Sequence, residues 1–224
     1  MGWKTIYKIT QKDFQNMYNA GQYNWGDHSI FSIIYAESEI FGAGKWSQQN
    51  SPVMLSPRLP HRPGTKTRIT VKVFTIWDPG ATGSVNVGVV FYKDGETCKD
   101  YKGDDLHGMK VSLLEPLSLT FGEFHTLTVE QENNTITYYA DGKFLNSVSL
   151  ESPLNTLAIG VYFSDVKITS TNAFIGYLVT DVTVEYYDVW EDIMNQITSM
   201  MNMMIWIMIA VVGISLFVRL FKKE

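Results

Sequence analysis

The feature that most constrains this chain is an apolar stretch near its C-terminal end. The 26 residues from Ile193 to Val218 carry no charged side chain. As a helix at about 1.5 Å per residue they would reach roughly 39 Å, more than the roughly 30 Å of a bilayer's hydrocarbon core. A buried helix of a soluble domain is usually shorter and keeps a polar face. The stretch therefore predicts a single membrane-spanning helix.

Charged and aromatic residues mark the two ends of this helix. The side chains expected near the membrane interfaces are one tryptophan and three basic residues, Trp206, Arg219, Lys222 and Lys223. Basic residues favour the cytoplasmic or interior side of a membrane. We therefore expect a single-pass membrane protein of a virion membrane or a cell envelope, with its C-terminal tail inside and its large domain outside.

The rest of the chain divides around this anchor. Its expected parts are a folded domain at 1–190, a juxtamembrane segment at 191–202, the membrane helix at 203–221 and a basic tail at 222–224. About 190 residues suffice for one sizeable core but not for two ordinary domains. The formal net charge is −5 and the 18 Lys and Arg residues are scattered along the chain. Without a basic stripe, nucleic acid is not expected as a partner of the main domain.

The first quarter of the domain combines one helix with irregular chain. Thr10, with Asp13 three positions on, resembles a helix N-cap, and Gly21 is placed to end the short helix. The segment 42–49 and the proline-rich run 51–64 are expected to form a long loop or an exposed arm.

From Thr65 onward the pattern is almost entirely β. Apolar and polar residues alternate at 69–75 and 85–92, and a turn is expected at 93–95. Further strands are expected at 110–114, 125–131, 135–140, 144–150, 157–163 and 174–190. Many short strands at this spacing indicate an antiparallel β-sandwich.

Two of these strands resemble a known family. The segment 123–130 reads Glu-Phe-His-Thr-Leu-Thr-Val-Glu, and after a turn the segment 135–143 ends in Asp-Gly-Lys. An aromatic-His-x-hydrophobic strand followed by a strand that ends in Asp-Gly resembles concanavalin-A-like and laminin-G-like domains. The last strand, 180–190, is similar to the closing strand of that fold. The resemblance covers roughly 65–190 and implies an all-β fold, an antiparallel jelly-roll sandwich of the concanavalin-A-like kind, here followed by one C-terminal transmembrane helix.

Relatives with this fold include β-glucanases, which the resemblance brings in as an enzyme hypothesis. Their catalytic strand carries a Glu-x-Asp-x-x-Glu-like set of carboxylates, because two such groups must flank the sugar bond. The nearest segment here is Glu37-Ser38-Glu39, which would place two carboxylates on one face of a strand. No third acidic residue follows at the required position. We therefore interpret this pair as solvated surface, expect no enzyme activity, and keep glycoside hydrolysis as a remote alternative.

A glycan-binding site would need exposed aromatic rings and a few polar groups that fix sugar hydroxyls. The candidates are three tryptophans and the polar residues near them, namely Trp25 with Asp27 and His28, Trp46 with Gln48, and Trp77. Packing in the core or in loops is the commoner role for each of these rings.

A calcium site is a further candidate, because calcium is common in the family that the chain resembles. Asp104 and Asp105 lie in a Gly-flanked loop with Asp100 and His107. The spacing does not match an EF-hand loop, and a polar hairpin tip is the simpler interpretation. No other cofactor is expected.

Two main hypotheses of function follow. The first is a non-enzymatic, membrane-anchored structural protein of a virion or surface assembly, which contacts neighbouring subunits through the region 42–64. It is motivated by residues 1–10, which have neither the apolar run nor the cleavage site of a secretory signal peptide. A tail-anchored protein with a cytoplasmic domain is the alternative topology. The second hypothesis is a glycan-binding protein for receptor recognition or adhesion.

Overall fold

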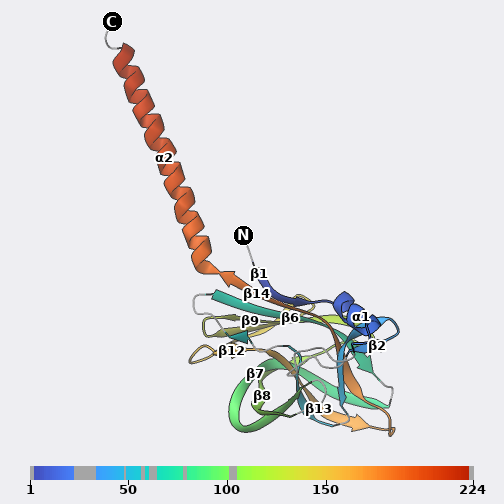
Figure 1. Cartoon of the computed structure of the whole chain (residues 1–224). Coiled ribbons are helices and arrows are strands. Elements are labelled where there is room, and N and C mark those ends of the chain that lie inside the picture. Colours follow the sequence, from blue (N-terminus) through green and yellow to red (C-terminus); the bar gives the residue numbers. More distant parts are fainter. Residues whose placement is uncertain are drawn as a thin grey trace. The chain divides into compact units, whose positions relative to one another are not determined.

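The structure, a computed structural model, describes residues 3–22, 34–47, 49–56, 59–60, 65–77, 80–100 and 105–221. The chain forms two compact units, one comprising Gly2–Tyr187 and the other comprising Asp188–Glu224 together with Met1. The first unit is a β domain and the second is a helix, and each is described by itself below (Figure 1).

The β domain contains a large sheet of eight strands. Along the sheet the strands run in the order β11 (Lys143–Ser149), β10 (Thr135–Ala140), β9 (Phe124–Glu132), β6 (Thr65–Trp77), β14 (Ile175–Asp188), β3 (Ile40–Ser47) and β2 (Tyr35–Glu37). The eighth strand, β1 (Lys4–Ile9), pairs with the second half of β14, which pairs with β3 through its first half. The pairs whose register is described are antiparallel.

A second sheet has four strands, β13 (Ile159–Ile168), β4 (Ser51–Met54), β7 (Ala81–Asp100) and β8 (Asp105–Leu117). Most of its pairing is antiparallel, and β4 also pairs in parallel with the far end of β7 at Lys99 and Asp100. The two short strands β5 (Leu59–Pro60) and β12 (Thr156–Leu157) form a separate pair.

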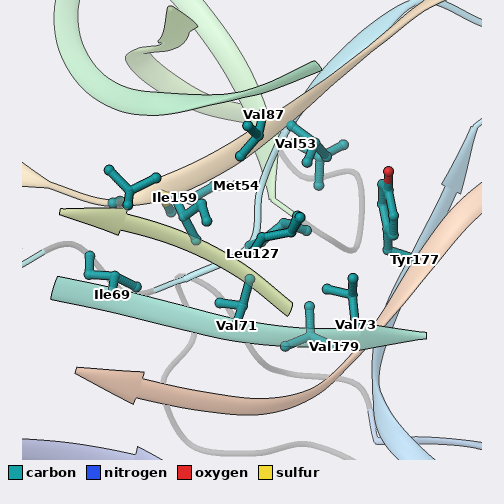
Figure 2. Close-up of a cluster of buried hydrophobic side chains, with 14 of the residues drawn as sticks. Val53, Met54, Ile69, Val71, Val73, Val87, Leu127, Ile159, Tyr177 and Val179 are labelled. Atoms are coloured by element: carbon teal, nitrogen blue, oxygen red, sulfur yellow. The ribbon is translucent and has the colours of Figure 1, made fainter. Parts of the chain in front are cut away.

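The core lies between the two larger sheets. Figure 2 shows Ile69, Val71 and Val73 of β6 on one side of the cluster and Val87 and Ile159 of the second sheet on the other. These side chains are fully buried. Contact between apolar faces of two sheets is the main stabilising term of a β-sandwich, so the fold class predicted from the sequence is confirmed.

Buried and more exposed residues alternate along the strands of the large sheet, and this alternation identifies its inner and outer faces. In β6 the odd-numbered residues 67–75 are buried and the even-numbered ones from Lys66 to Phe74 are half-buried. In β9 the residues His125, Leu127, Val129 and Gln131 are buried, whereas those between them face the opposite side. Successive side chains in a strand point to opposite faces, so the large sheet has an apolar inner face and a polar outer face.

The predicted helix is present as α1 (Gln11–Asn19). Thr10 and Asp13 form a capping box, in which the Asp13 backbone N–H donates to Thr10 Oγ1 and the Thr10 backbone N–H donates to Asp13 Oδ2. Phe14 is fully buried and fixes the helix to the core. This part of the sequence prediction is confirmed.

The prediction of an irregular arm at 42–49 and 51–64 is wrong for the described part of that region. Residues 42–47 belong to β3 and residues 51–54 to β4, and Val53, Met54 and Leu55 are buried. Gly42 is required inside β3 because a Cβ there would collide with the backbone carbonyl of Val179 in β14. Such a glycine marks close packing of two backbones and not a loop.

The turn predicted at 93–95 does not reverse the chain. Strand β7 runs from Ala81 to Asp100, and its pairing with β8 shows a register shift between Tyr92 and Thr97. A bulge of this kind bends a strand without ending it.

The second unit is the helix α2, which spans Val189–Phe221. It includes the segment 191–202 that the sequence analysis treats as juxtamembrane. Its stretch Trp190–Val218 has a mean hydropathy of 2.3, and none of it is buried in the structure. Trp206 is 71% exposed. Length and composition make α2 able to span a membrane.

Candidate functional site

The outer face of the large sheet carries a hollow of about 420 Å³. Its walls come from four adjacent strands, β14, β6, β9 and β10, and from the turn after β10. The lining residues are Arg68, Thr70, Thr128, Glu130, Tyr139, Gly142, Thr183 and Glu185. The hollow is therefore a polar site on a rigid scaffold, built from the side chains that alternation turns away from the core.

Arg68 is the centre of the charged group in this hollow. Its Nε donates to Glu185 Oε2 at 2.8 Å, and its Nη2 lies 2.7 Å from the same oxygen. Its Nη1 lies 3.5 Å from Glu130 Oε1. The three side chains are 16–26% exposed, so water screens the ion pairs only partly. Arg68 on β6 thus connects the two neighbouring strands, β9 and β14.

An aromatic pair packs beside this charged group. The Arg68 guanidinium carbon lies 4.0 Å from the centroid of the Trp3 ring, a cation–π contact. Trp3 in turn meets Tyr187 edge to face, with ring centroids 5.7 Å apart. The flat guanidinium is therefore held against a ring on one side and by carboxylates at its rim, which fixes its orientation.

Hydroxyl groups form the uncharged part of the hollow. Thr70 pairs in register with Thr128, and Thr128 with Tyr139. The Thr70 and Thr128 hydroxyl oxygens are 3.2 Å apart. Each hydroxyl can donate one hydrogen bond and accept others. Together with Thr183 on β14, these residues present a row of hydroxyls that matches a hydroxyl-rich ligand.

The electrostatics of the hollow favour hydrogen bonding over acid or base chemistry. Burial raises the pKa of the Tyr139 hydroxyl, and the charge of Glu130 and a hydrogen bond to it raise that pKa further. The phenol therefore stays protonated and acts as a donor. Glu185 accepts a hydrogen bond from Arg68, and Glu130 forms an ion pair with it, so two negative charges and one positive charge give the hollow a net negative charge. A site of this charge disfavours anionic ligands.

A second polar cluster lies at one end of β9. His125 Nδ1 is 2.8 Å from Asp141 Oδ2, and His125 Nε2 is 2.7 Å from the carbonyl oxygen of Thr120. Asp141 Oδ1 accepts from the Thr126 backbone N–H at 2.8 Å. Asp141 has φ 50° and Gly142 φ 72°, values that suit the Asp-Gly turn between β10 and β11. The cluster therefore pins the turn whose Gly142 lines the hollow.

The pKa values of His125 and Asp141 are shifted in opposite directions. Burial alone would lower the pKa of His125, but the hydrogen bonds to Asp141 and Thr120 raise it above its usual value. For Asp141, burial would raise the pKa, and the bonds to His125 and Thr126 lower it overall. Both neighbours of the imidazole are hydrogen-bond acceptors, so only the doubly protonated ring satisfies both contacts.

Most of the predicted site residues fall outside the described part of the chain. This holds for Trp25, Asp27, His28, Gln48, Asp104, Lys222 and Lys223. Four more lie in described elements, but their side chains are outside the described set: Trp46 in β3, Trp77 at the end of β6, Asp105 at the start of β8 and Arg219 in α2. The strands of Trp46 and Trp77 are separated by β14 in the large sheet.

The Glu37-Ser38-Glu39 segment is not arranged as the sequence analysis expected. Glu37 ends β2 and pairs with Ile40, the first residue of β3, so Ser38 and Glu39 form a two-residue hairpin loop. Both loop residues have positive φ, 44° and 72°. A chain reversal cannot place the two carboxylates on one face of one strand, so this prediction is wrong.

The metal prediction concerns residues on the β7–β8 connection. Among the residues that the structure describes, no group of three or more His, Cys, Asp or Glu is arranged to hold a metal ion. Asp104 and the Asp105 side chain are not among them. Calcium therefore stays a prediction from the sequence.

The sequence analysis did not identify the residues of the hollow. A partial signal was present, because basic residues at even positions of β6 face acidic residues at even positions of β9, as in the pairs Lys66–Glu132 and Arg68–Glu130. The role of Glu185 had no local signal, since it lies 117 residues from Arg68.

Known proteins show only distant likenesses to this chain. No protein-family model matches the chain, and no curated protein matches it. Matching solved structures include the Emp47p carbohydrate recognition domain (12% identity, TM-score 0.40, covering 69% of this chain and 85% of that one). A second is the catalytic domain of an endo-1,3-β-glucanase from Thermotoga petrophila, with 11% identity and a TM-score of 0.40, covering 84% of this chain and 98% of that one. A third is a carbohydrate binding module from Bacillus subtilis, with 13% identity and a TM-score of 0.36, covering 81% of this chain and 95% of that one. These are β-sandwich proteins of the kind that the sequence resembles. Likenesses this distant say nothing about function, and the fold class rests on the strand pairing above.

Proposed function

We propose that this chain is a single-pass membrane-anchored recognition protein whose β-sandwich binds a neutral carbohydrate in the hollow on its large sheet. The observation that carries the proposal is the set of lining side chains. Three threonine hydroxyls, two carboxylates, one guanidinium and the Tyr139 ring converge on about 420 Å³. Carboxylates and hydroxyls accept and donate in the pattern that sugar hydroxyls need, and an aromatic ring can stack on a sugar face.

The charge balance of the hollow supports a neutral ligand. Two carboxylates outnumber the one guanidinium, so sialylated or sulfated glycans would meet net repulsion. The carboxylates also support binding over hydrolysis, since both Glu130 and Glu185 are engaged by Arg68. A glycosidase needs one carboxyl group to deliver a proton and the other to act as nucleophile or base.

The anchoring part of the proposal rests on α2. An unburied apolar helix of this length is unstable in water, and a bilayer removes its side chains from water. The basic residues after Val218 favour an interior C-terminal tail and a large domain outside. Resistance of the full chain to alkaline carbonate extraction from membranes tests the anchor, and release into the supernatant would refute it.

Glycan binding is tested on an array of neutral and acidic glycans with the full chain in detergent. Thr128→Val and Thr183→Val remove lining hydroxyls at nearly constant volume and should each weaken binding by about five- to tenfold, as expected for one lost hydrogen bond. Thr137→Val is the matched control, because Thr137 lies on β10 but is not among the lining residues, and its hydroxyl oxygen is 3.2 Å from Ser147 Oγ. Absence of binding to every glycan, or a preference for acidic ones, would refute the proposal.

A structural role in a virion or surface assembly is a second proposal. It is favoured by the same unburied helix, which would fix a subunit to a membrane. The contact region that we predicted for it, 42–64, includes the strand residues 42–47 and 51–54, and its role in subunit contacts stays a prediction. Purification from membranes without any associated particle or lattice would count against this role.

A further inference from the structure

Three polar residues and one glycine of the helix α2 lie along one line of its surface. At 100° per residue, Asn195, Ser199, Asn202 and Gly213 fall within about 40° of one line along the helix. Trp206 and Ile209 complete this line, which we call the seam, at alternating spacings of four and three residues. That alternation is the repeat by which two helices remain in contact over several turns.

The opposite side of α2 has a different composition. Ile193, Ile197, Met204 and Val211 lie roughly 160–180° from the seam. Each of these side chains is at least 39% exposed. Three other polar residues lie off the seam. The Thr198 hydroxyl donates to the Met194 carbonyl of its own helix at 2.8 Å, and Ser215 can bond its own helix in the same way. Gln196 lies about 100° from the seam, next to Asn195. One side of the helix therefore suits lipid, and the seam does not.

The length of α2 places part of the seam inside the bilayer. Asn202 lies 17 residues before Arg219, about 26 Å along the helix axis, which is less than the roughly 30 Å of hydrocarbon. Asn195 lies about 36 Å from Arg219, outside the hydrocarbon. A primary amide in lipid loses its hydrogen bonds to water, so it gains from a partner on another helix.

We infer that α2 associates with the α2 helix of a second copy of this chain, in parallel, through the seam that contains Asn202. This inference rests on the membrane anchor of the proposed function. Self-complementarity selects the partner: an amide has both a donor and an acceptor, and a two-fold axis parallel to the helices brings each Asn202 beside its counterpart. Parallel copies are the natural partners because all copies insert with the same orientation. Gly213 has no side chain and therefore lets the two backbones approach closely.

Disulfide crosslinking in reconstituted vesicles tests the seam. The full chain with Cys98→Ser receives one cysteine, either Ile209→Cys on the seam or Val211→Cys on the opposite side. Phosphatidylcholine vesicles contain no other protein, so every crosslinked dimer consists of two copies. We expect copper-phenanthroline oxidation to crosslink Ile209→Cys at least fivefold more than Val211→Cys, because a disulfide needs close approach of the two Cβ atoms. Equal crosslinking at both positions would overturn the inference.

Two further variants test the chemistry of the contact in the Ile209→Cys background. Asn202→Leu should weaken association about three- to thirtyfold, the range for one interhelical hydrogen bond in a membrane. Its matched control is Met204→Leu on the opposite side, which should leave crosslinking unchanged. Gly213→Leu should also weaken association, although leucine is the better helix former and more apolar.

The outcomes separate this inference from the anchor itself. Chains that resist carbonate extraction but show no seam preference retain the anchor and refute the self-association. Release of the chains by carbonate would refute the membrane anchor, and with it the self-association that depends on the anchor. Unchanged crosslinking in both Asn202→Leu and Gly213→Leu would overturn the assignment of the seam even if a dimer forms.

Discussion

Replacing Asp141 by asparagine should invert the pH dependence of this domain's stability near neutrality. In the wild type, His125 faces two acceptors, the Asp141 carboxylate and the Thr120 carbonyl, and is fully bonded only as the imidazolium. In Asp141→Asn the amide oxygen can still accept from the Thr126 N–H, which turns the amide NH₂ toward His125 Nδ1. A neutral ring that donates from Nε2 then satisfies both contacts. The substitution therefore changes which protonation state the fold favours.

The sign in the wild type follows from the direction of the shift. Folding raises the pKa of His125, so the native state binds more protons than the unfolded state above the usual value of about 6.5. The stabilisation is fully present below that value and is lost as the pH rises through the folded pKa. For Asp141 the folded pKa is lowered, so its contribution is present above about 3.9 and is lost as the pH falls through the folded pKa. The pair contributes most between these two usual values.

The magnitude follows from the type of bond that is exchanged. A hydrogen bond to a charged group contributes about 1.5–3 kcal/mol and a neutral one about 0.5–1.5 kcal/mol. The Asp141 side chain is 45% exposed, so we take the low end because water screens the pair. We expect Asp141→Asn to cost about 1 kcal/mol at pH 6 and progressively less toward pH 8. Glu123, a weaker contributor to the His125 pKa, is unchanged in the variant.

Urea unfolding of the full chain in detergent, measured from pH 5 to 8, tests this reasoning. The free energy of unfolding should fall with pH in the wild type and rise with pH in Asp141→Asn. Asp165→Asn is the matched control, because Asp165 also has a positive φ, 55°, and is exposed. It should keep the wild-type profile. Parallel profiles for wild type and Asp141→Asn would refute the assignment of a charged His125–Asp141 pair.

Three further changes test the packing by chemical unfolding. Gly42→Ala should lower the free energy of unfolding by about 2 kcal/mol or more, because the new Cβ collides with the Val179 carbonyl; an unchanged midpoint would contradict the β3–β14 contact. Tyr138→Phe should be neutral or stabilising by about 1 kcal/mol, because within the described residues this buried hydroxyl has no hydrogen-bond partner, and a clear loss would reveal one. Thr10→Ala should cost about 1 kcal/mol through the lost cap of α1, and no loss would show that the cap is dispensable.

The strands after Thr65 could be predicted because their signals are local. The run 135–140 was predicted with the bounds that β10 has in the structure. It alternates buried and half-buried residues, and Asn133 and Asp141 in the flanking turns have positive φ, 52° and 50°. Residues that tolerate this conformation, next to a regular alternation, define a hairpin without knowledge of the rest of the chain.

The region from Gly42 to Met54 could not be predicted because its structure depends on distant strands. Glycine and proline there indicated loops by composition. In the structure Gly42 is needed where the β14 backbone comes close, and Pro52 lies in β4 beside Tyr162 of β13. Tertiary pairing overrode the local preference in both strands.

The hollow was missed for a related reason. The outward-facing residues of β6 have the composition of an ordinary solvated face. A single sequence does not show which acidic residues will lie beside Arg68. The choice of Glu185 depends on β14 lying next to β6, a pairing between strands far apart in the chain. The tryptophans were more conspicuous in the sequence, but the structure describes the side chain of none of the three.

The alternation of buried and outward-facing residues in β6 also makes the hollow rigid. Arg68 and Thr70 flank Ile69, which is fully buried, and Val71 continues the core on the other side of Thr70. A one-residue slip of β6 would move the apolar side chains to the surface, so the core fixes the register of the site residues as well. Burial of these side chains thus holds the hydroxyls and charges of the hollow in place before any ligand arrives, and a ligand that fits them binds with little loss of conformational entropy.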